Sequence, residues 1–286
     1  MSTVPVTTQA YLDRIGAARP SRPDTRALRD LHLRHLLTVP FENLSIHLGE
    51  DIVLEEKALL DKVVHARRGG FCYELGGSFA ALLRDLGFRV DFLQARTFGR
   101  EGGPGIPYDH LALRVGTDDG TGPWLVDVGF GDHSHYPLAL EERGDQEDPG
   151  GVFRVVETAE GDLDVLRNGE ARYRLERRSR SLSDFAAGAW YHRTSPESHF
   201  TRSPVCSLLT EDGRVTLSGR KLVTTVDGRR AERNLEGDAE TLAVYRDLFG
   251  IVLDRLPAVP GAPAAGRDGG PGAVQSPATL EFAESS

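Results

Sequence analysis

The residue best suited to chemistry in this chain is Cys72, which lies in the segment RRGGFCYELGG. It follows a pair of glycines and stands at the expected start of a helix that ends near Gly87. The amides and the dipole of a helix N-terminus stabilise a thiolate, the nucleophilic form of cysteine, and Arg67 and Arg68 add nearby positive charge. The alternative is a structural cysteine that acts as a small hydrophobic residue, the commoner role for a cysteine taken at random. The flanking residues favour the nucleophile.

Two more residues could activate such a thiol. His110 lies in IPYDHLALRV, at the start of an expected strand, and by itself it would more often be a structural histidine. Asp127 lies in WLVDVGFG, where a carboxylate interrupts an otherwise apolar strand. Burying an unpaired carboxylate costs several kcal/mol, so Asp127 needs a partner, and an imidazolium would satisfy it. Cys72, His110 and Asp127 would then work as a Ser-His-Asp triad does, with cysteine as the nucleophile.

Composition narrows the class of protein. The 286 residues are 39% hydrophobic and 27% charged, which is ordinary for one or two folded domains. The net charge of -9 argues against a nucleic-acid partner, because binding to phosphates depends on clustered Lys and Arg. No apolar run approaches the ~20 residues of a membrane span, and the N-terminal residues lack the features of a secretory signal. We therefore expect a cytoplasmic protein that binds neither nucleic acid nor membrane.

The cysteine and histidine content gives no indication of a metal site. Only two cysteines, Cys72 and Cys206, are present, too few for a thiolate-rich zinc site, and no histidine pair has the HExxH spacing. A disulfide between the two cysteines is not expected in a reducing compartment. Cys206 lies in the apolar segment SPVCSLLT and is interpreted as structural. No metal is predicted.

Residue periodicity predicts the elements that must position these side chains. Apolar residues recur every three or four positions through the first ninety residues, including a helix over 54–64. From residue 88 to about 178 the period changes to two, with Gly- and Asn-containing turns between strands. Short strands and a final helix near 240–249 follow. The chain divides into a helical domain (residues 1–87) with Cys72, a β domain (88–188) with His110 and Asp127, a mixed domain (189–256), and a disordered Pro/Gly/Ala-rich tail (257–286).

The segments around Cys72, His110 and Asp127 are RGGFCYE, DHLALRV and DVGFG. In sequence and in order they closely resemble the three catalytic motifs of the arylamine N-acetyltransferase family. Further segments, such as VPFENLSIHLGE, TSPESHF and GRKLVTTVDG, extend the resemblance over roughly residues 11 to 253. One departure is the pair Gly76-Gly77, where the family usually has Asn and a bulkier stretch. Glycines in a helix cost roughly 1 kcal/mol each, so this pair would loosen the segment behind Cys72.

The resemblance implies both a fold and a reaction. The fold is α+β, with a helical first domain, a β-barrel second domain and an α/β third domain around a cysteine-protease-like catalytic core. The reaction is a ping-pong transfer in which acetyl-CoA acylates Cys72 and CoA leaves. An arylamine, hydrazine or N-hydroxyarylamine then accepts the acetyl group. Acetyl-CoA is thus the implied co-substrate, and a small aromatic amine or hydrazine is the implied acceptor.

The resemblance also suggests binding residues. The loop after Asp127 would border the acceptor pocket and Phe41 would form a second wall, although the phenylalanines could instead be core residues. The segment TSPESHF would lie near the CoA cleft, unless it is a simple polar loop. Glu42 and Arg68 would form a supporting ion pair. The residues expected at the acceptor pocket are Gly129, Phe130, Gly131 and Phe41, and those expected at the CoA cleft are Thr194, Ser195, Ser198 and His199.

Other functions stay open on the sequence. An amide synthase of the same fold, which closes a macrolactam from a carrier-bound polyketide, would carry the same three catalytic residues. A cysteine hydrolase or a transglutaminase-like enzyme would also use them, because water or another amine can resolve an acyl-cysteine. A non-catalytic binding module is disfavoured by the presence of all three residue types.

Overall fold

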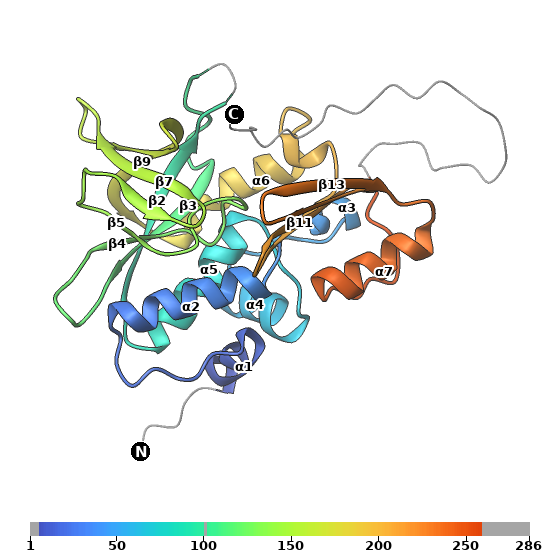
Figure 1. Ribbon diagram of the computed structural model, residues 1–286, viewed down its shortest axis with the longest axis horizontal. Helices are drawn as coiled ribbons and strands as arrows, with labels where there is room; N and C mark the ends of the chain where they lie inside the picture. The colour runs from blue at the N-terminus through green and yellow to red at the C-terminus, as the bar shows by residue number, and fades with distance from the viewer. Residues whose placement is uncertain (1–5, 100–101, 259–286) are drawn as a thin grey trace.

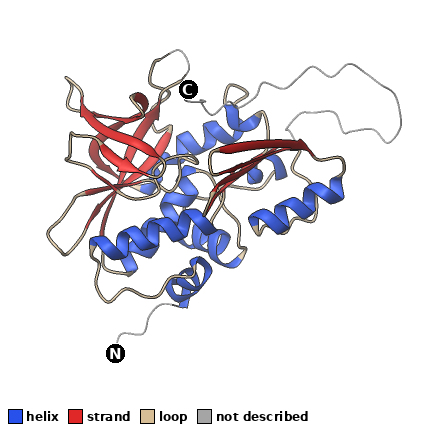
Figure 2. Ribbon diagram, in the orientation of Figure 1, coloured by secondary structure: helices blue, strands red, loops and turns tan. Residues whose placement is uncertain are grey.

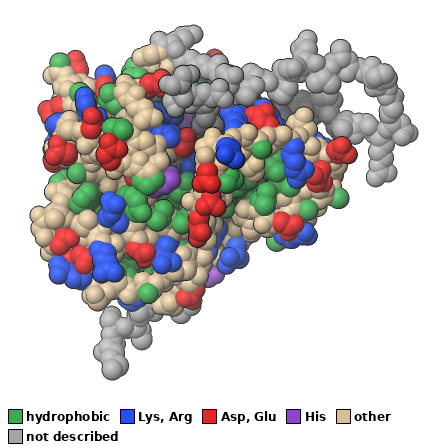
Figure 3. All heavy atoms as spheres, viewed as in Figure 1, with side chains coloured by type: hydrophobic (Ala, Val, Ile, Leu, Met, Phe, Trp, Pro, Cys, Tyr) green, Lys and Arg blue, Asp and Glu red, His purple; other side chains and the backbone are tan. Residues whose placement is uncertain are grey.

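The computed structural model describes residues 6–99 and 102–258, which form a set of helices and two antiparallel sheets (Figure 1). The tail predicted to be disordered, 257–286, lies outside the described residues except for its first two. None of the helices in the described ranges is both long enough and apolar enough to cross a membrane. On the face drawn in Figure 3, acidic and basic side chains are interspersed, with no large area of one sign.

The N-terminal region is helical, as the periodicity predicts. Helix α2 begins at the cap Asp24, whose side chain accepts a hydrogen bond from Ala27 N at 2.9 Å, and it buries Leu28 and Leu31. The helix predicted over 54–64 is present as a short α-helix that continues into a π-helical turn. The elements of this region are α1 (Val6–Ile15), α2 (Thr25–Thr38), α3 (Leu44–Leu48), α4 (Glu56–Leu60), η1 (Asp61–His65) and α5 (Cys72–Asp85).

Helix α5, which starts at Cys72, is buried over most of its length. It contacts α4 on one side and strand β3 on another. A Cβ added to Gly76 would lie 2.4 Å from Leu111 Cδ2, and one added to Gly77 would lie 2.4 Å from Leu59 Cδ1. The expectation that these glycines loosen the helix is therefore corrected. They let α5 pack closely on both neighbours, and this packing offsets their low helix propensity.

The larger sheet has eight antiparallel strands and curls into a nearly closed barrel (Figure 2). Apolar side chains such as Leu93, Phe153 and Tyr173 pack its inner face. A side chain bridges the two edge strands, since Gln146 accepts a hydrogen bond from Ala139 N at 2.7 Å and donates one to Ala139 O at 3.0 Å. In spatial order the strands are β5 (Leu138–Ala139), β4 (Trp124–Val126), β3 (His110–Gly116), β2 (Arg89–Thr97), β9 (Glu170–Arg180), β8 (Leu163–Arg167), β7 (Gly151–Glu157) and β6 (Gln146–Asp148).

The smaller sheet has five antiparallel strands, and its first strand comes from the helical region of the chain. β1 pairs with β10 through Glu42 and Cys206. Helix α7 packs on this sheet with Tyr245 and Phe249, and Cys206 is fully buried in the same core, as its apolar segment predicts. The strands in order are β1 (Phe41–Glu42), β10 (Val205–Thr210), β11 (Gly213–Ser218), β12 (Lys221–Val226) and β13 (Arg229–Asn234), followed by α7 (Asp238–Phe249).

Short helices join the two sheets: η2 (Leu182–Phe185), α6 (Ala186–Thr194) and η3 (His199–Thr201). The sequence did not predict α6, β1 or β13. β1 has only two residues, and every residue of β13 is exposed, so neither shows an apolar pattern. These elements exist because neighbouring strands and helices complete their hydrogen bonds and packing.

Candidate active site

Cys72 is the first residue of α5, and two contacts fix this end of the helix. The Glu74 carboxylate turns back to accept a hydrogen bond from Phe71 N at 3.3 Å, which caps the helix. The Tyr73 hydroxyl donates to the carbonyl oxygen of Tyr108 at 2.6 Å, in the loop before β3. Cys72 is therefore held at the junction of α5 and β3.

The same junction holds His110 and Asp127. His110 is the first residue of β3 and Asp127 follows the last residue of β4, and the antiparallel pairing of these strands brings the two ends together. His110 Nε2 lies 2.8 Å from Asp127 Oδ2, and Asp127 Oδ1 accepts a hydrogen bond from Gly129 N at 3.0 Å. The sequence placed Asp127 inside a strand. The strand ends one residue earlier, so the following turn supplies a second donor and both carboxylate oxygens are bound.

Burial and pairing shift the pKa values of the three residues. Burial acts to lower the pKa of His110, but the charge and the hydrogen bond of Asp127 outweigh it and raise that pKa to about 10. Burial acts to raise the pKa of Asp127, but the charge of His110 lowers it to about 2. Burial raises the pKa of the Cys72 thiol, while its hydrogen bond with His110 opposes this rise. The resting charges therefore lie on the histidine and the carboxylate, next to the thiol.

Arg67 and Arg68 do not supply the positive charge that the sequence suggested beside Cys72. The Arg68 guanidinium contacts Glu42 at 2.9 Å and Glu50 at 3.2 Å, and Arg67 is exposed. The expected source of charge is therefore wrong, since His110 is the cation that hydrogen-bonds to the Cys72 thiol. The predicted Glu42–Arg68 ion pair is confirmed.

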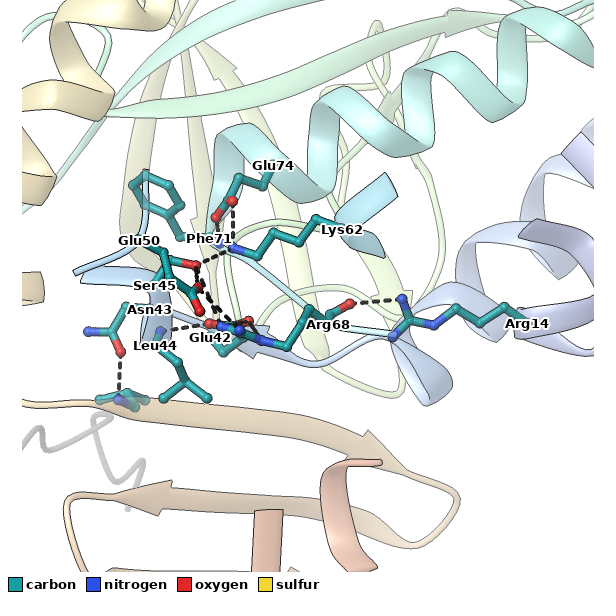
Figure 4. Close-up of polar contacts among 11 residues, drawn as sticks. Arg14, Glu42, Asn43, Leu44, Ser45, Glu50, Lys62, Arg68, Phe71 and Glu74 are labelled. Atoms are coloured by element: carbon teal, nitrogen blue, oxygen red, sulfur yellow. Dashed lines mark hydrogen bonds and ion pairs between the residues drawn. The ribbon is translucent and has the colours of Figure 1, made fainter. Parts of the chain in front are cut away.

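A buried polar network surrounds this ion pair and reaches the start of α5 (Figure 4). Lys62 Nζ lies 2.6 Å from the Glu74 carboxylate and donates to Ser45 Oγ at 2.8 Å. Arg14 donates to the carbonyl oxygen of Arg68 at 2.8 Å, which ties helix α1 to the same network. Because Glu74 also caps α5, the network supports the backbone that carries the nucleophile.

Cys72 and His110 line a cavity of about 200 Å³. An apolar cavity of roughly 150 Å³ holds a benzene molecule, so this cavity can hold one aromatic ring. Asp127 does not line the cavity and lies behind His110, where it contacts Nε2. The other predicted residues that line it are Phe41, Gly129, Phe130, Gly131 and His199.

The loop after Asp127 fits closely around Cys72. A Cβ added to Gly129 would lie 2.6 Å from Cys72 Cα, so only glycine allows this approach. Gly131 has a φ of +92°, and a Cβ added to it would contact the ring of Phe41. Phe130 packs edge-on against His110, with ring centroids 5.2 Å apart. The loop thus forms one aromatic wall and holds the imidazole in place.

Three of the four residues expected at a CoA cleft make local contacts instead of lining the cavity. Thr194 Oγ1 donates to Trp190 O at 2.7 Å, and Ser195 Oγ accepts from Glu197 N at 3.2 Å. The Ser198 hydroxyl caps η3 and contacts His192 Nδ1 at 3.1 Å. These three hydroxyls end α6 and start η3, and so they position His199, the fourth expected residue.

Several lining residues were missed at the sequence level. Asp109 has the clearest signal, because it directly precedes His110, and its carboxylate accepts a hydrogen bond from Thr97 N at 3.1 Å and contacts His192 Nε2 at 3.1 Å. The others come from three separate segments whose meeting no local pattern reveals. The missed lining residues are Asn43, Thr97, Asp109, Phe200, Val205 and Ser207.

Known proteins share this sequence and fold. A family model described as N-acetyltransferase matches residues 24–258. The chain is 33% identical to the arylamine N-acetyltransferase / N-hydroxyarylamine O-acetyltransferase of Salmonella typhimurium, over 85% of this chain and 88% of the relative. It is 34% identical to the arylamine N-acetyltransferase of Mycolicibacterium smegmatis, over 90% of this chain and 94% of the relative.

Solved structures agree with these matches. The arylamine N-acetyltransferase from Salmonella typhimurium aligns with a TM-score of 0.81 and 30% identity, over 87% of this chain and 92% of that one. The Mycobacterium marinum arylamine N-acetyltransferase in complex with CoA aligns with a TM-score of 0.79 and 32% identity, over 85% and 92% of the two chains. The chain belongs to the arylamine N-acetyltransferase family, and its α+β fold is the fold of that family.

Proposed function

We propose that this protein transfers an acetyl group from acetyl-CoA to an arylamine, a hydrazine or an N-hydroxyarylamine through an acetyl-cysteine at Cys72. The observation that carries the proposal is the connected set Cys72, His110 and Asp127 beside a cavity of about 200 Å³. The Mycobacterium marinum relative is described in complex with CoA, which supports a CoA thioester as the donor.

In the first half-reaction, Asp127 holds His110 through Nε2, which leaves Nδ1 for the Cys72 thiol. Because the charge of Asp127 keeps His110 protonated, the imidazolium stabilises the Cys72 thiolate, which attacks the thioester carbon once the thiol has lost its proton to solvent. The tetrahedral intermediate collapses with loss of CoA, which leaves with the proton from His110. Cys72 then carries the acetyl group as a thioester.

In the second half-reaction, the acceptor amine attacks the acetyl carbon of Cys72. A neutral aromatic amine is a modest nucleophile, so a thioester and a nearby base both help. His110, neutral after the first half-reaction, accepts the amine proton as the new C–N bond forms, and the Cys72 sulfur leaves as a thiolate beside the imidazolium. The same Asp127 contact therefore serves both steps, because His110 is an imidazolium at the start of the first and becomes one again in the second.

The aromatic walls suggest how the acceptor is held. We assign Phe130 and Phe41 as the surfaces that pack against the acceptor ring, with Gly129 and Gly131 allowing their approach. His199 is the residue of the CoA group that would meet the donor directly. Thr194, Ser195 and Ser198 would then act through the backbone that carries it.

The test is acetylation of Cys72 by acetyl-CoA in the absence of an acceptor, detected by mass spectrometry of the intact protein and its peptides. We expect one acetyl group on wild type, none on Cys72→Ala, and an unchanged result with Cys206→Ala, since Cys206 is fully buried away from the cavity. Addition of 4-methylaniline or a hydrazine should then remove the acetyl group as the acetylated amine. An acetyl group on Cys72→Ala, or a wild-type adduct that no amine removes, would contradict the proposal.

A further inference from the structure

Behind Phe130, side chains from both sheets form a group that we call the arginine cluster: Arg167 on β8, Arg172 on β9, Arg214 on β11, and Asp132. Asp132 follows Gly131 in the loop that walls the cavity. The cluster brings three cations to one carboxylate, and all four side chains are at least partly buried. Such an excess of buried positive charge is costly unless an anion balances it.

Asp132 balances only part of this charge. Arg167 Nη1 lies 2.8 Å from Asp132 Oδ2, and Arg167 Nε donates to Gly150 O at 2.6 Å. Arg214 Nε lies 3.6 Å from Asp132 Oδ1, and its Nη1 donates to Ser207 Oγ at 3.2 Å. Asp148 is a further acid in a neighbouring loop, but its oxygens already accept hydrogen bonds from three backbone amides.

Arg172 has no carboxylate and no hydrogen-bonding partner for its side chain anywhere in residues 6–99 and 102–258. Its Nε is buried and unsatisfied, which is unfavourable for a charged donor. Its Cζ lies 5.5 Å from the centre of the Phe130 ring. Burial and the charge of Arg167 lower the pKa of Arg172, and the charges of Asp132 and Glu170 oppose this only in part. The guanidinium therefore lies near the ring of Phe130 with a buried Nε–H that has no acceptor among the described residues.

Two cavity residues connect the cluster to the reacting groups. The Phe130 ring lies near both groups, with Arg172 Cζ 5.5 Å from its centre and the His110 ring centroid 5.2 Å away. Ser207 lines the cavity and is bonded to Arg214. None of the four cluster residues lines the cavity itself, so a bound molecule would reach the cluster through an anionic group that extends past Phe130 and Ser207.

We propose that the arginine cluster is a subsite for an oxyanion, a carboxylate or a phosphate, carried by a substrate bound at Cys72. This proposal rests on the proposed function. The oxyanion has two possible sources, the carboxylate of an aromatic amino acid acceptor such as 4-aminobenzoate, or a phosphate of the CoA donor. Arg172 is a substrate-binding residue in either case, because a guanidinium binds both groups with paired N–H donors.

The test compares binding to wild type, Arg172→Gln and Arg178→Gln by isothermal titration calorimetry. Arg178 is exposed on the same strand β9, so its variant has the same change in charge away from the cavity. The ligands form two pairs: 4-aminobenzoate with 4-methylaniline, and CoA with pantetheine. Each pair differs in an anionic group. We expect Arg172→Gln to weaken binding of the anionic member of one pair by about tenfold or more. Binding of the neutral member of that pair should change little.

Weaker binding of 4-aminobenzoate alone would identify the acceptor carboxylate as the group that the cluster binds. Weaker binding of CoA but not of pantetheine would identify a phosphate of the donor. Arg172→Lys, which retains the charge without the planar fork, should recover some of the loss. Equal binding by wild type and Arg172→Gln, equal losses for both members of a pair, or the same loss in Arg178→Gln would overturn the proposal. Because binding needs no turnover, absence of acetyl transfer to 4-methylaniline would count against the proposed function alone.

Discussion

Replacing Asp127 with asparagine removes one charge and keeps the shape of the side chain. In the native protein Asp127 binds His110 Nε2 with Oδ2 and accepts from Gly129 N with Oδ1. An asparagine that keeps the Gly129 contact through its oxygen presents its NH2 group to His110 Nε2. The imidazole proton is then forced onto Nδ1. His110 is then a neutral imidazole with its proton on the nitrogen that faces Cys72, so it carries no charge to stabilise the Cys72 thiolate and cannot accept the amine proton.

The size of the effect follows from the pKa of His110, which rises from 6.5 to about 10 in the folded protein chiefly through Asp127. Loss of the carboxylate removes most of this difference of about 3.5 in pKa, or up to about 5 kcal/mol of imidazolium stabilisation. Since this imidazolium stabilises the attacking thiolate, we expect acylation of Cys72 to slow by about 1,000- to 10,000-fold.

Single-turnover release of CoA from acetyl-CoA, without acceptor, measures this step directly. Asp145→Asn is the matched control, because Asp145 is an exposed carboxylate that pairs with Arg154 on the surface. Thermal unfolding of both variants separates a catalytic effect from a loss of folded protein. If Asp127→Asn were folded and acylated Cys72 within tenfold of the wild-type rate, the assigned role of Asp127 would be refuted.

Two further predictions concern stability. Glu42→Gln removes the main charged partner of buried Arg68, so we expect the free energy of unfolding in urea to fall by about 3 to 5 kcal/mol. A fall below about 1 kcal/mol would contradict this and would show that Glu50 replaces Glu42 as the partner. Because the pKa of His110 is raised to about 10, its stabilising contribution is complete below the unfolded pKa of 6.5 and is lost as the pH rises through about 10. The free energy of unfolding should therefore decline across this range more steeply in wild type than in His110→Gln, and equal slopes would contradict the pairing.

Local sequence signals located the three central residues. A glycine pair before an apolar helical pattern placed Cys72 at a helix start, and the change to a period of two placed His110 at the start of a strand. Asp127 was noticed because a carboxylate interrupted apolar residues. Each signal depends on neighbours in the chain, so periodicity and turn chemistry are enough to detect it. The boundaries of the three proposed domains and the cytoplasmic location stay predictions.

The partners of these residues depended on the tertiary structure. The sequence suggested that Arg68 would charge the thiol, whereas the fold binds Arg68 to Glu42 and brings His110 to Cys72. It suggested that glycines would loosen α5, whereas close packing uses the space that they leave.

By itself, then, the sequence determined which side chains could react and which local elements carry them, because helix starts, strand starts and motif residues depend on nearby chain. The cavity at Cys72 and the burial of Arg172 Nε without a hydrogen-bond partner in residues 6–99 and 102–258 were decided only by tertiary structure. The residues around both come from segments far apart in the chain. Their contacts depend on how the two sheets meet α5, which no local pattern encodes.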